Sequence, residues 1–113
     1  MNNVEIKILN DKKEVISVYY IHRLNVRANA RRVAMISVIL ELNCSEAEKS
    51  HLMTCAALAC TLRDKKGDLL FPEDNGWERI SEEMGLEEYV LLSQHYVTVN
   101  PNEQTLTAKK KKF

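Results

Sequence analysis

The stretch VAMISVILELNCSEAEKSHLMTCAALACTL, residues 33–62, decides the fold, because two apolar runs flank one short polar break. Within the break, Ser45 is followed three residues later by Glu48, a capping box that opens a helix. Upstream, Asn25 is a suitable N-cap for the first apolar run. The pattern therefore predicts two consecutive helices, one from Asn25 to about Leu42 and one from Ser45 to about Leu62.

Both predicted helices are apolar around most of their circumference, whereas a surface helix normally carries a single apolar stripe. A domain this small has few elements to cover them, so we expect a face left over for another copy or a partner. The alternative is a monomer in which the hairpin and the helices cover one another. On the first interpretation, the exposed apolar surface comprises Val38, Ile39, Leu42, Leu52, Met53 and Ala56.

The remaining sequence predicts a β-hairpin before these helices and two shorter helices after them. VEIKIL alternates apolar and polar residues, NDKK supplies a turn, and EVISVYYI is rich in β-branched and aromatic residues. NGWERISEEMG indicates a third helix closed by Gly85, and LEEYVLLSQHYVTV a fourth that ends before Pro101. We expect a mostly α (α+β) fold of about four helices, with one domain over residues 1–100 (hairpin 4–21, helical part 25–99) and a flexible, disordered C-terminal tail over 101–113.

Charge is unevenly distributed along the 113 residues, although 16 Lys/Arg balance 16 Asp/Glu. Residues 1–32 carry seven basic against three acidic side chains, and residues 63–89 carry four against nine. A polarised chain of this kind can associate with copies of itself or present unlike faces to partners, whereas a nucleic-acid binder normally has a basic excess. No apolar stretch reaches the ~20 residues that a membrane span needs. The N-terminus has no secretory signal and the three cysteines form no CxxC, so we expect a cytoplasmic protein.

Candidate catalytic and metal-binding residues are few. His51 and Cys55 share a helix face and could hold zinc together with Cys44 or His22, but the paired spacings of zinc sites are missing. A structural histidine beside a buried thiol is the favoured interpretation. No nucleophile elbow or glycine-rich phosphate loop can be assembled from three glycines. We therefore expect no enzyme activity, no metal and no cofactor.

Arg23, Arg27 and Arg31 recur every four residues, with Arg32 beside them, at the start of the first long helix. Positive charge at a helix N-terminus opposes the helix dipole. A partner could supply the missing negative charge, and the candidates are an acidic protein surface, the acidic segment 63–89 of this same chain, and DNA phosphate, which the zero net charge ranks last. An ordinary solvated basic face is the alternative.

The order of these parts resembles the small tail assembly chaperones of long-tailed, siphovirus-type bacteriophages. The likeness rests on HRLNVRANARRVAMI (residues 22–36), on MTCAALACTLRDKKGDLLFPED (residues 53–74) and on the two helices that follow, over roughly residues 20–100. It implies a non-enzymatic protein that binds the apolar helices of the tape-measure protein during tail tube assembly. It also implies a location in the host cell cytoplasm and absence from the mature virion. The basic face would then orient an acidic partner or a neighbouring copy in a homo-oligomer.

The same resemblance gives a meaning to the lysine run Lys109–Lys112. Lysine codons are adenine-rich, and in this family the gene typically makes a second, frameshifted product whose extension recruits the tail tube protein. The run would then mark the slip site, and the alternative is a solvated basic tail. Two competing functions stay open: a small oligomeric regulatory or DNA-binding protein in which Arg23 to Arg32 contact phosphate, and a structural connector retained in the virion.

Overall fold

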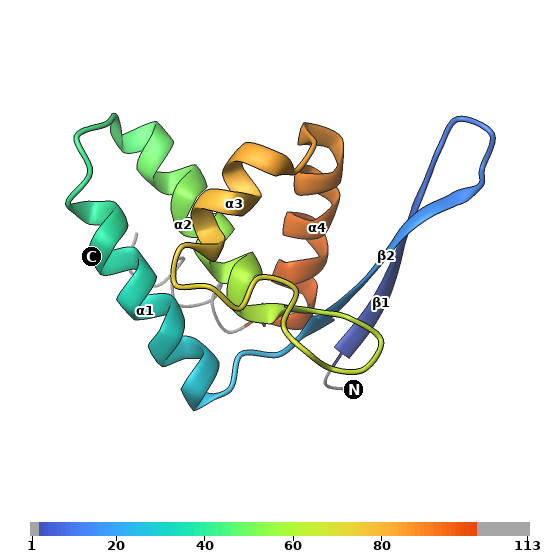
Figure 1. The fold of residues 1–113 in the computed structure, drawn as a ribbon, viewed down its shortest axis with the longest axis horizontal. Helices are drawn as coiled ribbons and strands as arrows, with labels where there is room; N and C mark the ends of the chain where they lie inside the picture. Colours follow the sequence, from blue (N-terminus) through green and yellow to red (C-terminus); the bar gives the residue numbers. More distant parts are fainter. Residues whose placement is uncertain (1–2, 102–113) are drawn as a thin grey trace.

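The computed structural model describes residues 3–101 and shows a helical domain from which a β-hairpin projects (Figure 1). Along these residues the elements are β1 (Asn3–Leu9), β2 (Val15–His22), α1 (Val26–Leu40), α2 (Glu46–Thr61), β3 (Leu62–Arg63), α3 (Gly76–Glu83) and α4 (Leu86–Val99). The predicted mostly α fold with an N-terminal hairpin is confirmed. The tail predicted over residues 101–113, including Lys109–Lys112, lies outside the described residues except for Pro101.

The two long helices begin where their capping residues predict. Asn25 Oδ1 accepts a hydrogen bond from the backbone N–H of Ala28 at 2.8 Å. Ser45 Oγ accepts one from the backbone N–H of Glu48 at 3.2 Å. Each bond satisfies a backbone donor that the first turn of a helix leaves without a partner. Side-chain chemistry in the sequence therefore fixes both starting points.

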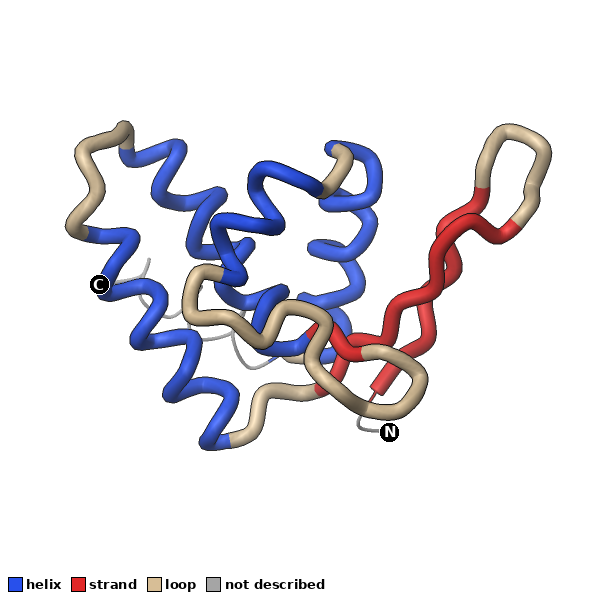
Figure 2. Tube along the Cα trace, viewed as in Figure 1, coloured by secondary structure: helices blue, strands red, loops and turns tan. Residues whose placement is uncertain are grey.

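Strands β1 and β2 form an antiparallel hairpin whose base packs on the helices and whose tip extends away from them (Figure 2). Ile6 and Ile21 point to the same side of the sheet and are 3 % and 0 % exposed. At the other end of the hairpin, Leu9, Val15 and Ile16 are 51, 51 and 61 % exposed. Burial of its base, together with the third strand, holds the hairpin in place, since an isolated hairpin is marginally stable in water.

The third strand, β3, was not predicted. It follows α2 directly, and its two residues pair with β2, Leu62 opposite Ile21 and Arg63 opposite Tyr20. Two residues are too few to show the alternation that identifies a strand in a sequence. The chain then turns at Gly67, whose φ of +92° is readily available only to glycine.

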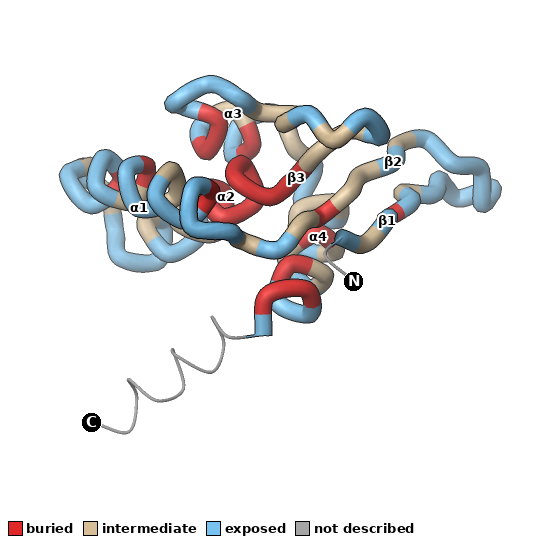
Figure 3. Tube along the Cα trace, turned by 90° about the horizontal axis from the view of Figure 1, so that it is seen from below, coloured by how far each residue is buried: buried red, intermediate tan, exposed pale blue. Residues whose placement is uncertain are grey.

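Helix α2 is the central element of the fold. It packs against α1, α3, α4 and β2, and every residue from Cys55 to Leu62 is buried (Figure 3). The expectation that this helix keeps an apolar face for a partner is therefore wrong for its C-terminal half. A helix that is apolar all round can be a buried, central helix. Helix α2 is one, and the sequence of α2 does not reveal which elements surround it.

Helix α3 approaches α2 closely at Gly76. A methyl group at this position would lie 2.9 Å from the carbonyl oxygen of Phe71 and 3.2 Å from Cβ of Ala59. We predict that Gly76→Ala lowers the free energy of unfolding by about 1–3 kcal/mol, the usual cost of overpacking. Gly85→Ala is the control, because nothing beyond its own neighbours in the chain lies within 4 Å of its added methyl group. Equal urea midpoints for the two variants would contradict the prediction.

Candidate functional site

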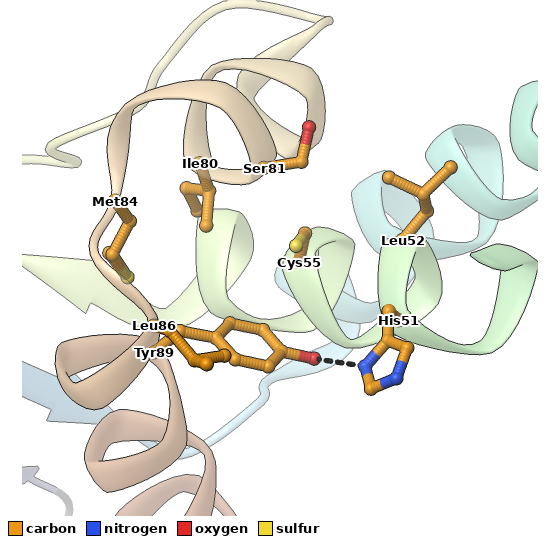
Figure 4. A pocket seen from close by; sticks show the side chains of 8 residues that line it. All are labelled: His51, Leu52, Cys55, Ile80, Ser81, Met84, Leu86 and Tyr89. Carbon is orange, nitrogen blue, oxygen red and sulfur yellow. Dashed lines mark hydrogen bonds between the residues drawn. The ribbon is translucent and has the colours of Figure 1, made fainter. Parts of the chain in front are cut away.

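The described part of the chain has an apolar pocket of about 340 Å³ between α2, α3 and α4 (Figure 4). Cys55 and Ile80 are 3 % and 1 % exposed and form its floor, while Leu86, 75 % exposed, stands at its mouth. All the residues that line it come from α2, from α3 and its C-cap, and from the first turn of α4: His51, Leu52, Cys55, Ile80, Ser81, Met84, Leu86 and Tyr89.

A polar contact between His51 and Tyr89 joins α2 to α4 at the edge of the pocket. His51 Nδ1 and Tyr89 Oη lie 3.2 Å apart (Figure 4), and the two ring centroids are 6.1 Å apart. Burial raises the pKa of the Tyr89 hydroxyl, so this group keeps its proton at neutral pH and can donate to the imidazole. The contact closes one side of the pocket.

The cysteine in the floor is an apolar wall rather than a reactive group. Burial raises the pKa of the Cys55 thiol to about 11, which leaves it protonated at neutral pH, and the thiolate is the reactive form of cysteine. Within residues 3–101, no group of three or more His, Cys, Asp or Glu side chains is placed to hold a metal ion. The chemistry of the pocket is therefore that of an apolar binding site.

An apolar stripe continues from the pocket along the outer face of α4. Leu86, Val90 and Val97 are 75, 44 and 39 % exposed, and Ser93 lies between the two valines. Spacings of four, three and four residues place these four side chains on one face of the helix. Because Leu86 also lines the pocket, stripe and pocket are continuous over the length of α4, about 21 Å. We call the pocket residues together with Val90, Ser93 and Val97 the α4 surface.

Acidic side chains border the α4 surface where α3 gives way to α4. Residues 73–88 contain seven Asp/Glu and one basic residue, Arg79. Arg79 Nε lies 3.1 Å from Glu83 Oε2 and neutralises that carboxylate, whereas Glu82 and Glu87 are exposed. The apolar site therefore lies within a negative potential, which favours an apolar ligand that carries positive charge beside its apolar part.

The apolar residues predicted to form the exposed surface are divided by the fold. Val38 is 54 % exposed, but Ile39 and Ala56 are each 0 % exposed. For these two the expectation is wrong, because they lie where α1 and α2 pack against each other and against the rest of the core. The partly buried residues of the predicted set are Leu42, Leu52 and Met53, and among the six residues Leu52 alone lines the pocket.

The predicted basic face is also divided. Arg23 lies before α1 and is exposed, as is Arg27 in the first turn of the helix. Arg31 instead turns inward: Nη1 donates to the carbonyl of Ala59 at 3.0 Å, and Nη2 donates to the carbonyls of Phe71 and Glu73 at 2.7 and 2.8 Å. Arg31 is therefore a structural residue, and its expected place on a partner-facing basic surface is wrong.

No family model matches this chain. Comparison with curated proteins and with solved structures gave no match either. Among the helices of residues 3–101, none combines the length and the apolar composition of a membrane span. Function therefore has to be argued from the surfaces of the molecule itself.

Most of the pocket was missed by sequence reasoning, which concentrated on the apolar runs of the first two helices. Ile80 lies in the short helix α3 and Met84 is its C-cap, and only the packing of α3 onto α2 brings them beside Cys55. One signal was available. The four-three-four spacing of Leu86, Val90, Ser93 and Val97 marks an apolar face on α4 that points away from the buried Leu92 and Tyr96.

Proposed function

We propose that this protein is an assembly chaperone that covers an apolar helix of its partner with the α4 surface. The role is that of the phage tail assembly chaperones, with the tape-measure protein as the partner. One observation supports it above all: an apolar pocket is continuous with an exposed apolar stripe on a helix, and together they extend about 21 Å. Such a surface suits an amphipathic helix, which places side chains at positions i, i+3, i+4 and i+7 against it.

The pocket gives this mode of binding an anchor point. Its volume of about 340 Å³ lies in the range of small-molecule and side-chain sites, roughly 300–1,000 Å³, and its floor is apolar. A bulky apolar side chain of the partner would enter it, while neighbouring side chains one helical turn away would cover Val90 and Val97. The acidic border at Glu82 and Glu87 adds a requirement: the partner helix should carry Lys or Arg beside its apolar stripe.

The remaining parts of the proposal come from the resemblance. The chaperone would act in the host cell cytoplasm, self-associate, and be left out of the mature virion. A frameshifted extension beginning near Lys109–Lys112, outside the described residues, would bind the tail tube protein. A nucleotide sequence with an overlapping reading frame entered at the lysine codons would support this part. A gene that ends at its stop codon with no overlapping frame would contradict it.

Binding of a defined helical peptide tests the surface. The probe is a labelled peptide of about 20 residues with a leucine stripe flanked by lysines. The control peptide has glutamate in place of each lysine. Fluorescence anisotropy should show binding of the lysine peptide, weaker at high salt because the acidic border is screened. The glutamate peptide should bind at least about tenfold more weakly.

Two matched variants locate the site. We predict that Val90→Asp weakens peptide binding by at least about tenfold, because a carboxylate would be desolvated against the apolar face of the helix. Val38→Asp is the control: the same substitution, at a position of similar exposure, 54 % against 44 %, on α1. Both should keep the helical circular dichroism. Co-purification with tape-measure fragments should likewise be lost in Val90→Asp and kept in Val38→Asp. Loss of binding in Val38→Asp alone would place the site at the α1–α2 end instead.

A regulatory DNA-binding role makes a different prediction for the same protein. Of the four arginines between positions 23 and 32, two are engaged within the fold: Arg31 as described, and Arg32, whose Nη2 donates to Asn29 Oδ1 at 2.9 Å. Binding to random duplex DNA with a steep salt dependence, and loss of that binding in Arg23→Ala, would favour this role over the chaperone.

A further inference from the structure

The outward face of α1 is apolar, although this helix lies at the edge of the molecule (Figures 1 and 3). Val26, Val33 and Leu40 are 89, 51 and 53 % exposed, and Ala30 and Ser37 are exposed between them. A surface helix normally turns charged and polar residues to the solvent. Helix α1 has apolar residues on both faces, and the inner face alone is covered by its own chain.

The exposed residues follow the spacing of a coiled coil. Positions 26, 30, 33, 37 and 40 alternate steps of four and three residues, which is the a/d pattern of a heptad repeat. We call these five residues the α1 seam. The small side chains of Ala30 and Ser37 would let a facing helix approach closely, since the distance between packed helices depends on the side chains at the contact. The seam runs the whole length of α1.

Charge on this face is confined to its two ends. In α1 and its C-cap, all of whose residues the structure describes, the exposed charged residues are Arg27 and Glu41. Each directly follows an apolar seam residue, Val26 or Leu40, so both charges flank the seam on the same side. They are fourteen residues apart, about 21 Å along the helix. Within α1 and its C-cap, positive charge therefore lies at one end of the seam and negative charge at the other, where the Lys49 ammonium of α2 also lies, 3.1 Å from the Leu40 carbonyl oxygen.

This pattern is complementary to itself in one orientation. If a second copy packs antiparallel about a two-fold axis near Ala34, Arg27 of each chain meets Glu41 of the other copy. A parallel arrangement would place like charges at the same end and leave both unpaired. Within one chain, Arg27 and Glu41 each oppose the helix dipole, whereas in the antiparallel pair each lies beside a helix end of opposite sign.

We propose that the α1 seam is the interface of an antiparallel, two-fold symmetric homodimer. A two-fold interface requires a surface that matches itself, and the charge pattern of α1 meets this requirement, which an unrelated partner helix would not need. The inference does not depend on the chaperone role. Helices α1 and α4 both pack on α2 and lie apart in Figure 1, so the dimer would leave the α4 surface open.

Charge exchange on the full chain tests the pairing. By analytical ultracentrifugation the native protein should be a dimer. Arg27→Glu and Glu41→Arg should each weaken the dimer by roughly tenfold, because two attractive contacts become repulsive. The double variant R27E/E41R should restore the native dissociation constant. Val33→Glu at the centre of the seam should give a monomer with unchanged circular dichroism, and Val97→Glu on α4 should leave the dimer intact.

Cysteine crosslinking tests the orientation, in a Cys44→Ser background because the other two native cysteines are buried. Val33→Cys lies near the two-fold axis and should crosslink to itself, whereas Val26→Cys should crosslink only with Leu40→Cys. A native protein that stays monomeric at about 1 mM, a dimer indifferent to Val33→Glu, or self-crosslinking of Val26→Cys would overturn the proposal. So would loss of lysine-peptide binding in Val33→Glu, which would make the seam part of the site for that helix.

Discussion

Ile39→Asp should strongly destabilise the protein, whereas the same change at the preceding residue should be tolerated. Ile39 is 0 % exposed and belongs to the apolar core beneath α1. A carboxylate at this position has no cationic partner and must either lose its hydration or open the core. The expected loss is about 4 kcal/mol or more, a large part of the 5–15 kcal/mol that stabilises a small domain. Thermal denaturation followed by circular dichroism should show a Tm lower by at least about 15 °C.

Val38→Asp is the matched control for this prediction. Val38 is 54 % exposed, so its carboxylate stays hydrated and the free energy of unfolding should change by no more than about 0.5 kcal/mol. The pair distinguishes a core position from a surface position one residue away on the same helix. If Ile39→Asp kept its native Tm and lost only partner binding, Ile39 would belong to an exposed surface as first expected, and the packing described for α1 would be wrong.

Local signals in the sequence predicted the helices well because each signal acts over a few residues. The N-caps Asn25 and Ser45 bond to backbone groups three residues away, and the hairpin strands show their alternation directly. Pairing of β3 depends instead on a contact between residues about forty positions apart, Ile21 and Leu62. A two-residue strand carries no periodic pattern of its own, so only the folded chain reveals it.

Composition alone predicted an exposed apolar face on both long helices and did not show that the rest of the chain covers them to different extents. Helix α2 is the more apolar over its C-terminal half, yet α1, α3, α4 and the sheet surround that half completely. Helix α1 has a partner on its inner side only, and its seam stays exposed. Apolarity around a helix therefore indicates either a central position or an interface, and the number of neighbours, which a single sequence does not give, decides between them.

The expectation that Arg31 lies on a partner-facing basic surface failed for a related reason. Spacing four residues apart correctly placed Arg27 and Arg31 on neighbouring positions of one helix, but it did not show that the Phe71–Glu73 segment passes over α1 near Arg31. That segment presents backbone carbonyls to the guanidinium. The Arg79 guanidinium contacts the same segment: it lies 5.2 Å from the Phe71 ring centroid and 2.8 Å from a Glu73 carboxylate oxygen. Two arginines thus hold the loop that leads into α3, and with it one wall of the pocket.

Arg31→Met should lower the free energy of unfolding by about 3 kcal/mol, because three hydrogen bonds from a charged donor are lost and the carbonyl of the buried Ala59 is left without that partner. Arg31→Lys should recover only part of this, since an ammonium cannot reproduce the planar fork that contacts three carbonyls. Arg23→Met, at an exposed position before α1, should change stability by no more than about 0.5 kcal/mol.

Hydrogen exchange supplies a local measurement: amides of residues 68–76 should exchange faster in Arg31→Met than in Arg23→Met. The lysine peptide should also bind more weakly to Arg31→Met, because α3 is less firmly placed. Equal denaturation midpoints and equal exchange in the two variants would mean that the loop keeps its position without Arg31.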